Sequence, residues 1–250
     1  MPEGTIHTRD DGAVRIISIE RPEKKNALTA AMYVELNAAL DAAAGDAKVR
    51  ALLITGTQGV FTAGNDLADF LHAPPDNEDA PVIQLLYRLA GLEKPLIAAV
   101  DGPAVGIGTT LLLHCDDVLA TARAKFMLPF VNLGLVPEAG SSLLLPMQVG
   151  MRRASRWLLC GEPFDGKAAL EAGLINELVE PDQLLAAALA RARVYAARPQ
   201  EALLAAKWLI RGHHREQVRE TIRAEVKIFA ERLRSQECKS ALSAFLEKKK

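Results

Sequence analysis

The chain has 250 residues and a mass of 27.0 kDa, enough for one large hydrophobic core without disulfides or a structural metal. Half of the residues are hydrophobic, 24% are charged and 5% are aromatic, which excludes a disordered chain and disfavours a base-stacking surface. Thirty basic against 31 acidic residues leave a net charge of −1, unlike the basic footprint of nucleic-acid-binding proteins. We therefore expect a partner that binds in a pocket, and no nucleic acid.

The cysteines and the termini carry no pattern of metal binding or export. Cys115, Cys160 and Cys238 are far apart and include no CxxC pair, so neither a disulfide framework nor a metal site is predicted. The first residues lack the regions of a signal peptide, and no run approaches the ~18 apolar residues of a membrane span. The final LEKKK differs from the peroxisomal signal Ser-Lys-Leu. We expect a cytoplasmic protein that does not associate with membranes.

The first half of the chain predicts strands that alternate with helices. A β-rich run at residues 14–19 ends at Arg21-Pro22, and Thr29 is placed to cap a helix that stops at Gly45. Residues 51–55 and 96–100 are short, almost wholly apolar runs, typical of strands buried on both faces. Between them, residues 72–80 form a polar, proline-containing stretch, either a substrate loop or a disordered segment.

The second half continues with a strand-like segment at residues 117–128 and then becomes helical. Pro137 to Ser142 opens an apolar helix, and residues 165–173, 181–197, 199–211 and 214–234 all carry helical periodicity. This alternation predicts an α/β fold. Residues 211–250 hold 11 basic and 6 acidic residues, so this tail is basic on an otherwise acidic body. It is interpreted first as a solvated face, with a subunit contact or an anion site as alternatives.

Two glycine-containing turns follow the two buried strands, at residues 61–67 and 102–108. Glycine lets the backbone approach a neighbour closely, and unpaired N–H groups after such turns could converge on one oxygen as an oxyanion hole. The alternative is that the glycines only permit tight turns. Gly106 and Gly108 also begin a dinucleotide-binding motif, but Leu111 replaces its third glycine.

Glu138 and His114 are the titratable residues of most interest. Glu138 stands at the predicted start of an apolar helix, where the helix dipole alone favours an acid. The functional alternative is a general base whose pKa rises in an apolar pocket. His114 ends an apolar segment and is interpreted as a core or interface residue.

Over nearly the whole chain, the sequence resembles the crotonase, or enoyl-CoA hydratase/isomerase, superfamily, because short motifs of that family occur here in the same order. They are Arg21-Pro22 with Asn26-Ala27-Leu28, residues 61–67, residues 94–102, Cys115-Asp116 and residues 172–176. The resemblance implies a spiral of ββα repeats in residues 1–198 and a C-terminal helical trimerisation segment in residues 199–250. It also implies an acyl-CoA thioester as substrate, no separate cofactor, and assembly as a homotrimer or hexamer.

The resemblance also assigns site residues. The family's oxyanion hole would be formed by the backbone N–H groups of Asn65 and Ile107. The family's hydratases carry two glutamates where this chain has Thr110 and Phe130, so hydration is disfavoured. Glu138 instead falls where Δ3,Δ2-enoyl-CoA isomerases of the peroxisomal type keep their single glutamate. This implies an isomerase that moves the double bond of a 3-enoyl-CoA to the 2-trans position with one base.

The coenzyme A and acyl positions follow from the same resemblance. The loop at residues 71–80 is expected to order around the acyl chain. The residues expected to bind the acyl-CoA are Lys25, Ala27, Leu28, Thr62, Ala63, Gly64, Asp66, Leu67, Phe130 and Leu133. A CoA-thioester hydrolase or dehalogenase of the superfamily, and a non-catalytic acyl-CoA-binding protein, remain as alternatives.

Overall fold

The computed structural model describes residues 4–72, 75 and 77–247. The strands are β1 (Thr5–Asp11), β2 (Val14–Glu20), β3 (Ala51–Gly56), β4 (Leu96–Val100), β5 (Pro103–Val105), β6 (Asp117–Ala120), β7 (Lys125–Met127), β8 (Phe164–Asp165) and β9 (Glu177–Leu178). The α-helices are α1 (Ala30–Gly45), α2 (Leu67–His72), α3 (Pro81–Gly91), α4 (Ile107–Thr110), α5 (Ser141–Val149), α6 (Met151–Cys160), α7 (Gly166–Glu171), α8 (Leu184–Ala196), α9 (Gln200–Leu233) and α10 (Gln236–Glu247). Short 3-10 helices are η1 (Pro22–Lys24), η2 (Leu111–His114) and η3 (Val131–Leu133).

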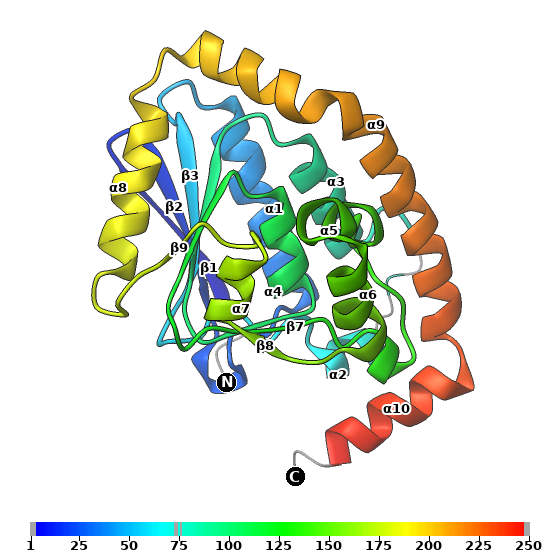
Figure 1. The fold of residues 1–250 in the computed structure, drawn as a ribbon. Coiled ribbons are helices and arrows are strands. Elements are labelled where there is room, and N and C mark those ends of the chain that lie inside the picture. The colour runs from blue at the N-terminus through cyan, green and yellow to red at the C-terminus, as the bar shows by residue number, and fades with distance from the viewer. Residues whose placement is uncertain (1–3, 73–74, 76, 248–250) are drawn as a thin grey trace.

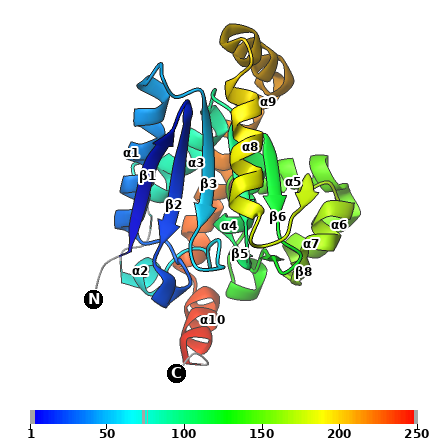
Figure 2. The same cartoon turned by 90° about the vertical axis from the view of Figure 1, so that its left-hand side faces the viewer.

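A six-stranded sheet in the order β1-β2-β3-β4-β6-β9 forms the centre of the molecule (Figure 1). Its strands are parallel except β1, which pairs antiparallel with β2. Alternate side chains enter two cores. Helix α8 covers one face of the sheet (Figure 2). Ile16, Leu53 and Ile97 form a core with residues of α8, whereas Ile17 and Ile54 enter the main core with residues of α1 and α3. The apolar runs at residues 51–55 and 96–100 are therefore strands buried on both faces, as predicted.

A second, three-stranded sheet has the order β5-β7-β8. From β4 to β7, consecutive strands alternate between the two sheets: β4 and β6 belong to the first, and β5 and β7 to the second. Strand β8 then extends the second sheet, and β9 returns to the first. The chain thus winds as a spiral that passes repeatedly between the two sheets. The predicted strand at residues 117–128 is accordingly two strands, because the turn at Thr121 to Ala124 carries the chain from one sheet to the other.

The first helix matches its prediction, and other elements differ. Thr29 caps α1 by accepting a hydrogen bond from the Met32 N–H. Strand β1 and helix α3 were not predicted. The predicted break in the last helices is wrong, because α9 continues through Gly212 without interruption. Of the predicted loop at residues 72–80, the first residue ends α2 and residues 73, 74 and 76 lie outside the described residues.

Helix α9 packs along one side of the molecule and α10 turns away from its end (Figure 1). Its Val218, Ile222, Phe229 and Leu233 belong to the main core. The interpretation of the basic tail as a solvated face is wrong for several arginines, because their guanidinium groups donate to backbone carbonyls of the body. These arginines are Arg211, Arg215 and Arg232. In the part of the chain that the structure describes, no helix combines the length and apolarity needed to span a membrane.

Candidate active site

The two glycine turns lie side by side at the carboxyl ends of β3 and β4. Thr62 donates its N–H to the Pro103 carbonyl at 3.0 Å, and its own carbonyl accepts the Val105 N–H at 3.0 Å. Gly64 has a φ of +86°, and a Cβ there would lie 2.6 Å from the Val105 carbonyl oxygen. Gly106 also has a positive φ, of +55°. Glycine is therefore required for this contact between the turns.

Each turn presents a backbone N–H without a protein acceptor. Among the described residues, neither the Asn65 N–H nor the Ile107 N–H donates a hydrogen bond. Gly106 caps α4, so the Ile107 amide belongs to the first turn of that helix, where no carbonyl is available. Two free amides on adjacent turns are what an oxyanion hole requires.

A small cavity lies beside these turns. It measures about 20 Å³, which is room for roughly one water molecule. The residues that line it are Asn65, Phe70, Pro75, Val82, Ile83, Leu86, Glu138, Val226 and Phe229. Asn65 and Glu138 therefore face the same space, whose other described walls are Pro75 and apolar side chains from α2, α3 and α9. The predicted acyl-pocket residues Phe130 and Leu133 are absent from this lining; Phe130 is buried and Leu133 packs against the core from η3.

Glu138 is 5% exposed and lies in the loop before α5. The placement in the first helical turn is therefore wrong: Ala139 and Gly140 both have left-handed backbones, with φ of +61° and +71°, and the helix begins at Ser141. Thr110 donates its hydroxyl to Glu138 Oε1 at 2.5 Å. Burial raises the pKa of Glu138 from 4.5 to about 8, the Thr110 bond opposes this rise, and the Glu225 carboxylate adds to it.

Two further buried groups surround this carboxyl. His114 Nε2 lies 2.8 Å from the Ala139 carbonyl oxygen, and burial lowers the pKa of His114 to about 4. The ring is therefore neutral and donates to that carbonyl, which confirms it as a core residue. Tyr33, not predicted as a site residue, donates its hydroxyl to Asn65 Oδ1. Burial and then the charge of Glu138 raise the pKa of Tyr33 well above its usual value.

The two segments predicted to hold coenzyme A are hydrogen-bonded to each other. Ala63 donates its N–H to the Lys25 carbonyl at 2.9 Å, and Leu28 donates to the Gly64 carbonyl at 2.8 Å. Asp66 in turn donates its N–H to the Leu28 carbonyl at 2.9 Å. Thr62, Ala63, Gly64, Asp66 and Leu67 therefore adjoin Lys25, Ala27 and Leu28 in one backbone cradle next to Asn65.

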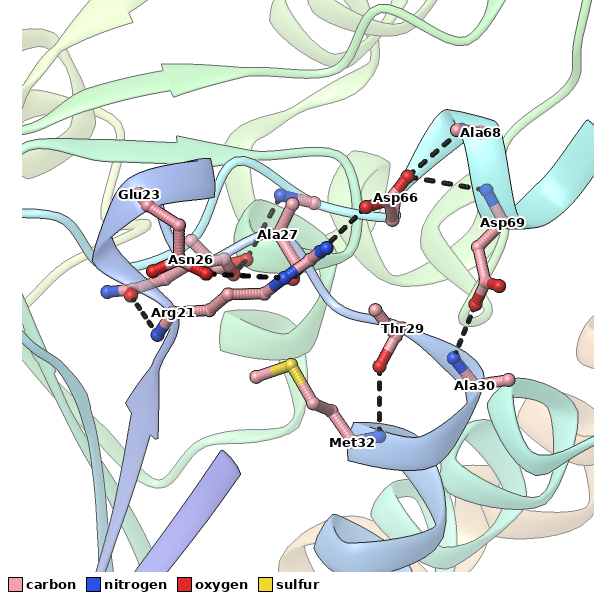
Figure 3. A network of polar contacts seen from close by, with 12 residues as sticks. Arg21, Glu23, Asn26, Ala27, Thr29, Ala30, Met32, Asp66, Ala68 and Asp69 are labelled. Carbon is pink, nitrogen blue, oxygen red and sulfur yellow. Dashed lines mark hydrogen bonds and ion pairs between the residues drawn. The ribbon is translucent and has the colours of Figure 1, made fainter. Parts of the chain in front are cut away.

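Arg21 and Asn26, treated above only as landmarks, tie this cradle together (Figure 3). Arg21 forms an ion pair of 2.6 Å with Asp66 and donates to the Ala27 carbonyl at 3.2 Å. The fully buried Asn26 side chain accepts the Arg21 N–H at 2.8 Å and donates to Val60 at 2.7 Å. The backbone of Asn26 is left-handed, a conformation that Asn tolerates better than most residues. In the sequence, the only signal for this role was that Asn is a residue typical of turns.

No group of three His, Cys, Asp or Glu residues within residues 4–72, 75 and 77–247 has the geometry of a metal site. The described residues that converge on the cavity are instead one carboxyl group, one amide turn and apolar side chains. Such a site can hold a proton and stabilise negative charge on an oxygen.

Comparisons with known proteins show the family to which the chain belongs. The family model for enoyl-CoA hydratase/isomerase matches residues 9–250. Enoyl-CoA delta isomerase 2 from Rattus norvegicus is 34% identical over 98% of this chain, which spans 64% of that relative's length. The 2,3-dehydroadipyl-CoA hydratase of Escherichia coli is 36% identical, with 94% of this chain and 93% of the relative covered.

Solved structures share the fold. OdaA from Pseudomonas aeruginosa superposes with a TM-score of 0.94 at 44% identity, covering 96% of this chain and 98% of that one. An enoyl-CoA hydratase/isomerase from Pseudoalteromonas atlantica gives a TM-score of 0.94 at 41% identity, covering 97% of both chains. The chain therefore belongs to the enoyl-CoA hydratase/isomerase, or crotonase, family and has its α/β fold.

Proposed function

We propose that the protein is a Δ3,Δ2-enoyl-CoA isomerase that shifts the double bond of a 3-enoyl-CoA to the 2-trans position. One observation carries the proposal: Glu138 is the one carboxyl group among the described residues that line the cavity beside Asn65. Double-bond migration needs one base that takes a proton and returns it, whereas syn-addition of water needs groups that activate water and protonate carbon.

In the proposed reaction, Glu138 transfers the proton and the two free amides stabilise the negative charge. The Glu138 carboxylate takes a proton from C2 of the substrate, and the electron pair moves into the thioester to form a dienolate. The negative charge then lies on the thioester oxygen, where the N–H groups of Asn65 and Ile107 stabilise it. The same carboxyl group, now protonated, gives its proton to C4, which leaves the double bond between C2 and C3.

The apolar walls support this transfer. Phe70, Val226 and Phe229 exclude water from the carboxyl group, so the proton stays on Glu138 between the two steps. With a pKa raised to about 8, Glu138 has a basicity closer to that of the thioester carbon acid than an exposed glutamate has. Because the cavity has room for about one water molecule, an acyl chain requires its walls to move outward.

Hydration is the second candidate, because several relatives are hydratases by name. In the family's hydratases two glutamates handle the water, and this chain has Thr110 and Phe130 at those positions. Thr110 donates its hydroxyl to Glu138 rather than supplying a second acid, and Phe130 is buried outside the cavity lining. These contacts favour isomerisation over hydration.

The test is an assay with cis- and trans-3-hexenoyl-CoA in which the conjugated 2-enoyl thioester is followed by its absorbance. We expect turnover by the wild type and loss of at least about 1,000-fold in Glu138→Gln, with unchanged affinity for a saturated acyl-CoA. Glu220→Gln, an exposed change on α9, serves as the matched control. Turnover by Glu138→Gln near the wild-type rate, or faster hydration of 2-hexenoyl-CoA than isomerisation, refutes the proposal.

The coenzyme A and assembly predictions complete this proposal. We place the adenine end of the thioester along the cradle of Lys25 to Leu28, where Lys25 is exposed. We further propose a homotrimer or hexamer, supported by the exposed apolar side chains of Trp208, Leu209 and Ile210 on α9. Light scattering of the full chain measures the mass of the assembly, and a monomer contradicts this part.

A further inference from the structure

Glu225 is a buried carboxyl group that the reaction above does not use. It lies on α9, is 6% exposed, and faces the N-terminus of α5. Its Oε2 accepts the Gly140 N–H at 2.6 Å, and its Oε1 accepts both the Ser142 N–H at 2.9 Å and the Ser142 hydroxyl at 2.5 Å. Both carboxylate oxygens are therefore occupied by donors from the residues that follow Glu138.

These bonds fix a turn that would otherwise be disfavoured. Ala139 has a left-handed backbone, with φ of +61°. This conformation is unfavourable for any residue that has a Cβ atom, so it persists only where surrounding contacts hold it. Glu225 accepts the Gly140 N–H. His114 donates to the Ala139 carbonyl, which belongs to the same peptide unit, so both polar groups of the peptide that follows Ala139 are held. The orientation of the Glu138 side chain depends on this turn, because it directly precedes Ala139.

We propose that Glu225 is a positioning residue for Glu138: its carboxylate clamps the first amides of α5 and so aims the Glu138 carboxyl into the cavity. The proposal rests on the proposed isomerase function and names a support for the same site. It also explains why α9 carries an acid at a buried position, since three donors offset part of its desolvation. Burial still raises the pKa of Glu225, and the bonds from Ser142 and Gly140 oppose that rise.

Charge adds to the geometry. The titratable groups that face Glu138 or its turn are Tyr33 on α1, His114 in η2 and Glu225 on α9. His114 is neutral above a pH of about 4, and Tyr33 is neutral because burial raises its pKa. Glu225 is thus the group whose negative charge raises the pKa of Glu138. Removal of that charge moves the pKa of Glu138 downward.

The same stretch of α9 also forms a wall of the cavity. Val226 follows Glu225 directly, and Phe229 is one turn further along, where its ring meets Phe70 edge-on at 6.4 Å between centroids. A displacement of this helix by a bound acyl chain is therefore transmitted to the turn of Glu138 through the Glu225 carboxylate.

The test compares Glu225→Gln with the wild type and with Glu220→Gln, which makes the same charge change at an exposed position of α9. The Gly140 and Ser142 N–H groups bind different oxygens of Glu225, and a glutamine replaces one of these oxygens by an NH₂ group that faces a donor. We expect kcat to fall about 10-fold or more, KM to stay within about twofold, and the rise of kcat/KM with pH to move about half a pH unit lower. Glu220→Gln should behave as the wild type.

A second variant and a second measurement keep the outcome decisive. Ser142→Ala removes one donor and leaves the carboxylate in place, so it should fold and shift kcat in the same direction by a smaller factor. NMR titration of ¹³C-labelled glutamate carboxyl groups, assigned with Glu138→Gln, reports the pKa of Glu138 without any turnover. We expect a lower pKa of Glu138 in Glu225→Gln.

The outcomes separate the two proposals. A wild type without isomerase activity refutes the proposed function, whereas the titration still tests the link between Glu225 and Glu138. An active wild type whose Glu225→Gln and Ser142→Ala variants keep kcat, the pH profile and the pKa of Glu138 refutes the positioning role alone. A loss of activity that comes with a raised KM and an unchanged pH profile also refutes it, because that result indicates a general loss of structure.

Discussion

Glu138 should make the protein less stable as the pH rises, and Glu138→Gln should remove this effect. The group is buried, and its pKa is about 8 in the folded protein against 4.5 for an ordinary glutamate. A group whose folded-state pKa is raised contributes stability below its unfolded pKa and loses that contribution as the pH rises through the folded value. The window for this group is therefore pH 4.5 to 8.

The magnitude follows from the same values. Each pH unit between the two pKa values corresponds to about 1.4 kcal/mol, so the wild type should lose about 3.5 kcal/mol relative to Glu138→Gln between pH 5 and pH 8. Glutamine has nearly the same shape and keeps an oxygen that can accept the Thr110 hydroxyl, so no cavity is created. The NH₂ group that it adds does not titrate, so its effect on stability is the same at every pH and cancels from the pH dependence. The substitution therefore isolates the cost of the buried charge.

Urea denaturation at pH 5, 6, 7 and 8 measures the free energies of unfolding of both proteins. We expect the two curves of stability against pH to diverge, with Glu138→Gln the more stable protein at pH 8. The exposed Glu220→Gln should run parallel to the wild type. Curves for wild type and Glu138→Gln that stay within about 0.5 kcal/mol of parallel would show that Glu138 titrates as an ordinary carboxylate, and would refute the reasoning.

Three further substitutions test the rest of the site. Gly64→Ala places a Cβ 2.6 Å from the Val105 carbonyl, so kcat in the hexenoyl-CoA assay should fall about 100-fold or more; an active variant contradicts the oxyanion turn. Thr110→Val removes a hydrogen bond that lowers the pKa of Glu138, so the pH at which kcat/KM rises should increase. An unchanged pH profile contradicts the role of this bond. Asn26→Ala leaves buried donors and acceptors unpaired and should lower the free energy of unfolding by about 3 kcal/mol in urea, where a change below about 1 kcal/mol contradicts it.

Strands that are buried on both faces could be predicted because their sequences are almost wholly apolar. Residues 51–55 and 96–100 needed no partner to be identified, and they are the central strands β3 and β4. Strand β1 could not be predicted in this way. Its sequence, TIHTRDD, is mostly polar, since it lies at the edge of the sheet with much of its surface exposed, and only its pairing with β2 makes it a strand.

The local chemistry of the site could be predicted, but its three-dimensional partners could not. Gly64 and Gly106 indicated two unusual turns, and the resemblance to the family then implied Asn65 and Ile107 as their amide donors. That these turns touch depends on β3 and β4 being neighbours in one sheet, which no local pattern contains. Most of the cavity walls come from α2, α3 and α9, a convergence that depends on the fold, whereas Phe130 and Leu133 stay predictions for the bound acyl chain.

Glu225 was overlooked although the sequence does contain a signal for it. Val218, Ile222, Phe229 and Leu233 form a helical stripe that is buried in the main core, and Glu225 falls on that stripe between the second and third of them. A carboxylate on a buried stripe is disfavoured unless donors meet it, so its position alone predicts a partner. Only the fold reveals that the donors follow Glu138 in the chain. In this proposal, a helix in the segment for which the resemblance implies trimerisation also supports the base.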